Sequence, residues 1–329
     1  MILRPVRDDE EDAEVVREVA AAAFGAPRSL PYGDDGGGSG SGDERDGGGG
    51  GGSGGRGYGG YGGGYGARSA GGWSGWSPDR IARHHGRTRH LARTDPGGCW
   101  LVEEEPYGPV GAVLSSRREG TWALSLLAVV PGAQGKGLGK ALLARAMVHG
   151  RACLRGVICA PADPVAVRTF RRAGFDVHPA MRLTGLADHA RLAPLDGAVH
   201  VGTPRHRDLM DSVDRRTRGG AHGPDHEELL RHHQLLVVDD FAGSGYCYLR
   251  RGRVESLAAT SRRLATRLLT AALLAAPEGE PVRVGRVLAE AQWAVDVGVA
   301  AGLQITNDGF VCLRGMRPPE LALASSTLP

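Results

Sequence analysis

The chain has 329 residues, 41% of them hydrophobic, so it is long enough for about two domains that each bury an apolar core. Its 40 Lys and Arg residues nearly balance 37 Asp and Glu residues, for a formal net charge of +3. This balance argues against a dedicated nucleic-acid-binding protein, which needs a concentrated cationic surface.

Neither a membrane segment nor a cysteine framework is visible. No apolar run approaches the roughly 18 residues of a membrane span, and the acidic start of the chain is unlike a signal peptide. The five cysteines are scattered without CxxC spacing, and no histidines show the spacing of metal ligands. The sequence therefore predicts a cytoplasmic protein, monomeric or homodimeric, with no metal and no membrane contact.

Helix and strand patterns alternate along the first half. Residues 33–75 interrupt this pattern as a Gly-rich stretch. Ordering glycine costs the most entropy and few apolar side chains offset that cost, so we expect a disordered insertion. The other predicted elements are a strand over 1–6, a helix over 13–24, a helix capped by Asp79, strands over 99–103, 110–116 and 122–130, a helix from Gly137, a strand over 157–160 and a helix over 163–174 capped by Asp163.

A similar succession begins near Asp196. Its predicted elements are a largely helical stretch over 209–234, strands over 235–238, 245–249 and 253–259, a helix over 261–276, a strand over 282–284, a helix over 289–301 and a strand over 310–314. Two α/β units of the same order predict a tandem repeat of one fold. We expect domains over residues 1–190 and 196–317, followed by a tail over residues 318–329.

The most informative stretch joins an apolar strand to a helix through a glycine-rich loop. Gly135, Gly137 and Gly139 alternate around the predicted helix start. Without side chains there, a ligand can approach the backbone, and the unpaired N–H groups of a helix N-terminus point at its negative charge. Lys136 and Lys140 add positive charge. The pattern predicts an anion-binding site.

Other glycine-rich motifs fit this loop less well. A dinucleotide-binding loop reads Gly-x-Gly-x-x-Gly in the first βα unit, whereas four strands precede this one. A P-loop needs Gly-Lys-Ser/Thr, but Leu138 and Gly139 stand in its place. A turn that binds nothing stays the alternative, although alternate glycines at a helix start are unfavourable unless a ligand needs them.

The loop closely resembles that of the GNAT superfamily of acyl-CoA-dependent N-acetyltransferases. The family signature Gln/Arg-x-x-Gly-x-Gly/Ala is matched from Gln134 to Gly139. A second family segment, Asn-x-x-Ala-x-x-x-Tyr-x-x-x-Gly-Phe, resembles residues 163–175, with Asp163 in place of Asn and Phe170 in place of Tyr. The resemblance covers roughly the first 186 residues, apart from the insertion.

This resemblance implies a fold and a cosubstrate. The fold would be α/β (α+β): two GNAT-like domains, each a twisted mixed sheet flanked by helices. Acetyl-CoA would bind in a cleft of the first domain, its pyrophosphate on the loop and its pantetheine arm along the strand as an added strand. The implied contact residues are Ala128, Val129, Gln134, Gly135, Lys136, Gly137, Leu138, Gly139 and Lys140.

The second half resembles the superfamily more weakly. Where the glycine loop should stand, the chain reads Thr260-Ser261-Arg262-Arg263, so close backbone approach of a pyrophosphate is excluded. We interpret this half as a degenerate, structural repeat.

The catalytic groups are not evident from the sequence. Phe170 occupies the position where many GNAT enzymes keep a Tyr as general acid, and a packing role in the core is the alternative. No carboxylate lies on the strand over 122–130, which leaves Ser125 and Glu103 as weak candidates for a general base. His149 is interpreted as a cation at a helix C-terminus.

Two functions are therefore open. The first is an acetyl-CoA-dependent N-acetyltransferase, in which an amine of a small molecule or peptide attacks the thioester directly. The second is a non-catalytic acyl-CoA-binding sensor or scaffold, since the loop fits both and the usual Tyr is missing.

Overall fold

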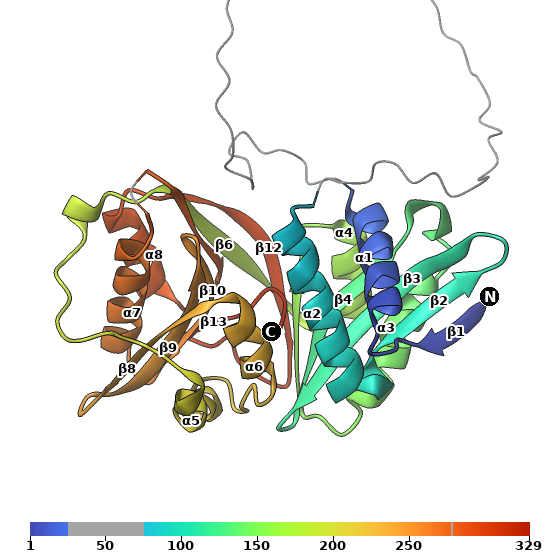
Figure 1. The fold of residues 1–329 in the computed structure, drawn as a ribbon, viewed down its shortest axis with the longest axis horizontal. Helices are drawn as coiled ribbons and strands as arrows, with labels where there is room; N and C mark the ends of the chain where they lie inside the picture. Colours follow the sequence, from blue (N-terminus) through green and yellow to red (C-terminus); the bar gives the residue numbers. More distant parts are fainter. Residues whose placement is uncertain (26–75, 278) are drawn as a thin grey trace, which may run out of the picture.

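The computed structural model describes residues 1–25, 76–277 and 279–329, so the predicted insertion over residues 33–75 lies outside the described part. One twisted mixed sheet of 13 strands runs through the molecule and is flanked by helices (Figure 1). The predicted fold class is confirmed. Among the described helices, none combines the length and the apolar character needed to cross a bilayer.

The helices and strands follow the predicted order, with three additional strands. In the first half they are β1 (Ile2–Pro5), α1 (Glu10–Phe24), α2 (Pro78–Thr94), β2 (Trp100–Glu104), β3 (Gly108–Arg118), β4 (Thr121–Val129), α3 (Leu138–His149), β5 (Arg155–Ala160), α4 (Pro164–Arg172) and β6 (Asp176–Leu186). In the second half they are β7 (His200–Val201), α5 (Arg207–Thr217), α6 (Asp225–His232), β8 (Gln234–Asp240), β9 (Gly243–Arg250), β10 (Arg253–Ala259), α7 (Arg262–Leu274), β11 (Pro281–Val287), α8 (Gln292–Ala300), β12 (Gln304–Arg314) and β13 (Ala322–Leu323). Short 3₁₀ turns lie at Pro96–Gly98, Pro131–Ala133, His189–Arg191 and Pro204–His206.

Side-chain caps fix where several helices begin. Ser77 caps α2 by accepting from the Arg80 N–H, with Pro78 in the first turn, so the predicted cap at Asp79 is wrong by two residues. The predicted cap of α4 is confirmed, because the Asp163 carboxylate accepts from the Ala166 N–H at 2.7 Å. Asp163 is therefore engaged in a structural role.

The two halves exchange a strand. The sheet order is β1-β2-β3-β4-β5-β12-β6-β11-β10-β9-β8-β7. Strand β12 of the second half pairs with β5 and β6 of the first, and β6 in turn pairs with β11 of the second half. Figure 1 shows β6 and β12 side by side at the centre of the molecule. The expected boundary near residues 190–196 thus separates segments whose strands are interleaved.

Three strands were not predicted: β6, β13 and the two-residue β7. β6 carries Pro179 and Gly185, which weaken a strand pattern, and its 11 residues alternate poorly between apolar and polar. β13 is only two residues long and lies in the predicted tail. Residues 318–329, called the 318–329 segment below, are therefore packed against the sheet, with Leu328 only 2% exposed.

A buried network of charges joins the two halves. Asp225 of α6 accepts from Arg118 of β3 at 2.6 Å and contacts His90 of α2 at 2.8 Å. Arg118 also contacts Asp95 at 2.7 Å. Burial opposes the charge of Asp225, but His90 and Arg118 outweigh it and hold the pKa of its carboxyl below the ordinary value. The network fixes α6 against the first half.

We expect Asp225→Asn to destabilise the protein by about 3 kcal/mol, since breaking a buried ion pair leaves Arg118 and His90 without their full partner. Because the pKa of Asp225 is depressed in the folded chain, its charge stabilises the fold above about pH 4 and that contribution disappears as the pH falls through the folded pKa. Urea unfolding at several pH values measures both effects. Asp296→Asn on the exposed side of α8 is the matched control and should change little; equal stability of both variants would contradict this account.

Candidate functional site

The sheet opens between β4 and β5. These parallel strands pair only from Thr121 to Leu124 on β4. At Ser125 a β-bulge interrupts the pairing of β4 with β3, and no described strand pairs with the other edge of β4 beyond that point. The open edge between Ser125 and Val129 is a place where an extended ligand can add as a strand.

The glycine loop lies at the end of this open edge. Gly137 caps α3 in a left-handed conformation with φ of 82°, and Gly135 has φ of 78°. No described heavy atom lies within 4 Å of a Cβ built at either position. No described side chain caps α3, so its first N–H groups face outward and favour an anion.

Several residues that the resemblance assigned to CoA lie together around this loop. The Gln134 side chain donates to the Val129 carbonyl at 2.9 Å and ties the loop to the end of β4. Lys136 lies 3.7 Å from Glu104, so part of its charge is balanced within the protein. Leu138 is buried, and only its backbone can face a ligand.

The weak catalytic candidates are scattered. Glu103 accepts from Arg4 at 2.7 Å on β2, which β3 separates from β4, so it is not at the open edge. Phe170 is 4% exposed and packs in a core cluster with Trp122 and Phe175. Ser125 does lie where β4 and β5 separate, but its hydroxyl donates to a main-chain carbonyl of the 318–329 segment.

His149 is the last residue of α3, as expected, and its Nε2 lies 3.0 Å from a carboxylate oxygen of Asp95. Burial opposes the charge of Asp95, yet His149, Arg118 and Thr94 together hold the pKa of its carboxyl below the ordinary value. This histidine belongs to the network between the halves rather than to the open edge.

The second half has an equivalent opening that is already filled. Glu255 is the bulge residue of β10, as Ser125 is of β4, and the parallel pairing with the next strand again stops just before it. Beyond the bulge, Leu257 and Ala258 pair with β13 of the 318–329 segment. This contact could not be predicted from the sequence, because a strand of two residues in the predicted tail shows no alternation of apolar and polar side chains.

The start of α7 also differs from that of α3. Ser261 caps α7 by accepting from the Leu264 N–H, and the helix start carries no glycine. That this half does not bind CoA stays a prediction. Both features that define the first opening, an open strand edge and a glycine loop, are thus missing from the second.

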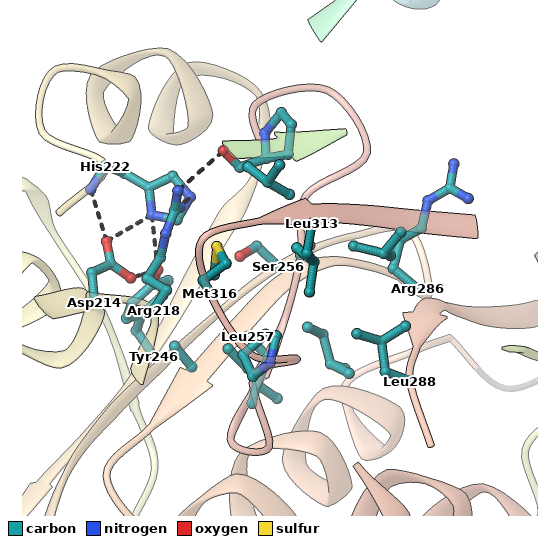
Figure 2. A pocket seen from close by; sticks show the side chains of 18 residues that line it. Asp214, Arg218, His222, Tyr246, Ser256, Leu257, Arg286, Leu288, Leu313 and Met316 are labelled. Carbon is teal, nitrogen blue, oxygen red and sulfur yellow. Dashed lines mark hydrogen bonds and ion pairs between the residues drawn. The ribbon is translucent and has the colours of Figure 1, made fainter. Parts of the chain in front are cut away.

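The second half contains a buried His/Asp cluster. Donor atoms of Asp214, His222 and His226 lie within 4.8 Å of one another, close enough to hold a metal ion. However, Arg218 contacts the second ring nitrogen of His222, whose Nδ1 lies 2.6 Å from Asp214 (Figure 2). Tyr246 donates to the other carboxylate oxygen at 2.5 Å. Burial and the neighbouring Arg218 lower the pKa of His222, so a neutral ring that accepts from Arg218 and donates to Asp214 satisfies these two residues without a metal. The Nε2 atom of His226 lies 3.2 Å from the same Asp214 oxygen and has no hydrogen-bond partner among the described residues.

A small cavity adjoins this cluster. Its volume is about 40 Å³, enough for a few water molecules. Figure 2 shows Asp214, His222 and Tyr246 at one end and Arg286 and Leu288 at the other. Its lining comes from both halves, but it is too small for an organic acceptor.

Comparison with known proteins finds a family match over part of the chain and a shared fold over nearly all of it. Residues 72–175 match the family model of the acetyltransferase (GNAT) family. A Pyrococcus horikoshii protein that carries the provisional name acetyltransferase is 15% identical, with a TM-score of 0.65, over 99% of this chain and 95% of that chain. A tandem GNAT protein from the clavulanic acid biosynthesis pathway is 13% identical, with a TM-score of 0.50, over 96% of this chain and 99% of that chain. No curated protein matched the sequence.

The stretch that matches the GNAT family model includes the open edge of β4, the glycine loop and α3. At these identities the solved structures establish a shared fold, and one of them is itself a tandem GNAT protein. The family match and the fold together support an acyl-CoA-dependent acetyltransferase in general.

Proposed function

We propose that this protein is an acetyl-CoA-dependent N-acetyltransferase whose cosubstrate binds in the first half only. The observation that carries the proposal is the combination of an open β4 edge with an outward-facing helix start at Gly137. The pyrophosphate would lie on the loop from Gln134 to Gly139, where N–H groups and the helix dipole favour it. Lys140 is exposed and adds attraction.

The pantetheine arm would run from this loop back along β4. Backbone groups near Ala128 and Val129 would hydrogen-bond it as an added strand. A backbone N–H of β4 would polarise the thioester carbonyl. The amine lone pair attacks the carbonyl carbon, a C–N bond forms, the C–S bond breaks, and CoA leaves as the thiolate while the amine releases a proton to water.

Two observations favour the second candidate, a non-catalytic acyl-CoA-binding module. Phe170 offers no proton to the leaving thiolate, and the hydroxyl of Ser125 is engaged by the 318–329 segment. A thiolate is nevertheless a tolerable leaving group, so the missing acid lowers the rate without preventing the reaction. The two candidates therefore share a binding site and differ in turnover.

A thiol-release assay separates them. The protein is incubated with acetyl-CoA and a panel of polyamines, aminoglycosides, amino acids and N-terminal peptides, and free CoA thiol is measured. We expect release above the amine-free rate with at least one class. Binding of acetyl-CoA without amine-dependent release for any class would contradict the transferase and favour the binding module.

A further inference from the structure

The 318–329 segment lies across the opening of the first half. The Thr327 carbonyl accepts from the Ser125 hydroxyl on β4, and the Ser325 carbonyl accepts from the Cys159 thiol on β5 at 3.5 Å. These are the two strands that separate. The segment thus bridges β4 and β5 at the point where the two strands begin to separate.

The segment is anchored in the second half. One carboxylate oxygen of the buried Glu255 accepts from the Ser325 hydroxyl at 2.7 Å, the Thr327 hydroxyl at 3.0 Å and the Ser326 N–H at 3.2 Å. On one side β13 pairs with β10, and on the other Arg218 donates to the Pro329 carbonyl at 3.2 Å. Moving the segment away would leave the buried Glu255 carboxylate without its hydrogen-bond donors, which is energetically unfavourable. Glu255 therefore holds the segment in place.

The segment lies where the acyl group of a bound cosubstrate would end. If the pyrophosphate lies on the glycine loop after Val129, the arm runs back along β4 toward Ser125. The thioester end therefore arrives where Thr327 and Ser325 stand. Leu328 packs in the same core cluster as Leu126, which closes the space behind them.

We propose that residues 325–328 form the end wall of the acyl site and restrict the first half to short acyl-CoA thioesters. This inference rests on the proposed function. A longer acyl chain would have to move backbone that Glu255 and the sheet hold in place. The second half, degenerate as a cosubstrate site, thereby sets the acyl specificity of the first.

Calorimetric titration with CoA, acetyl-CoA, propionyl-CoA and hexanoyl-CoA tests the wall without any acceptor. We expect the first three to bind alike and hexanoyl-CoA to bind about tenfold more weakly or worse, as is usual when a packed site must take extra methylenes. Glu255→Ala removes the anchor and should bring hexanoyl-CoA to within about threefold of acetyl-CoA. Ser325→Ala/Thr327→Ala is a milder variant that keeps Glu255 in place, and Glu290→Ala on the exposed surface is the control.

Alkylation of Cys159, followed by mass spectrometry, reports whether the segment has moved. Burial raises the pKa of this thiol to about 11, and the Ser325 carbonyl covers it, so slow labelling is expected in the parent protein and faster labelling in both anchor variants. Unchanged labelling in both would overturn the anchoring role of Glu255. Equal binding of hexanoyl-CoA and acetyl-CoA by the parent protein, or weak hexanoyl-CoA binding that persists after labelling has accelerated, would overturn the wall. Failure of CoA itself to bind would instead overturn the proposed function.

Discussion

Gly137→Val should raise the Kd for acetyl-CoA by about 100-fold or more, the loss that corresponds to about 2.7 kcal/mol. Two effects combine at this residue. Its φ of 82° is one that a β-branched residue rarely adopts, so the helix start shifts or is strained. Its Cβ would also project from the N-terminus of α3, where the pyrophosphate must approach the backbone closely.

A matched Gly→Val variant at another position of the loop tests whether any added side chain in the loop weakens binding. Gly132→Val also meets no described atom within 4 Å, but Gly132 does not have a positive φ and precedes the helix start. It should bind acetyl-CoA with nearly the parent affinity. Thermal melting checks that both variants fold. Parent-like affinity in Gly137→Val, with its melting temperature retained, would show that the glycine loop is not the pyrophosphate site.

Separating the two halves should prevent the first from folding. A fragment that ends at residue 194 keeps β5 and β6 but loses β12, which lies between them, and β11, which pairs with the other edge of β6. In the fragment, β5 and β6 would then expose unpaired backbone groups and apolar side chains, so we expect an unfolded or aggregated product. Circular dichroism and size-exclusion chromatography measure the outcome.

Co-expression of residues 1–194 with residues 195–329 is the control, because the break falls in an exposed connection between β6 and β7. The two fragments should assemble and regain cooperative melting. A monomeric, cooperatively melting fragment 1–194 would contradict the interleaved sheet. Recovery only on co-expression would confirm that the exchanged strands make the halves interdependent.

The local elements were predictable where one physical signal dominated. The apolar run of β4, the glycines before α3 and the cap of α4 each act through neighbouring residues, so periodicity and capping chemistry identify them. The exchange of β6 and β12 was not predictable. Strand pairing depends on contacts more than a hundred residues apart in the chain, and the weak alternation of β6 specifies no partner.

The candidate site likewise has a part that depends on local sequence and a part that depends on contacts between distant residues. The backbone geometry of the loop from Gln134 to Gly139 follows from its local sequence, because two of its glycines take the left-handed conformations, and its role in binding stays a prediction. The contacts of Ser125 and Glu255 with the 318–329 segment were not, since each joins residues at least 70 positions apart. A serine or threonine near a buried carboxylate has no signature in one sequence, and only the folded chain shows that Glu255 has partners.

Titration of the full-length protein with acetyl-CoA tests the central claim most directly. The first half has the open strand edge and the glycine loop, whereas β13 covers the equivalent edge of β10 and α7 begins without glycine. The account predicts one binding site per chain, abolished by Gly137→Val. Two sites per chain, or one site that survives Gly137→Val unchanged, would contradict it.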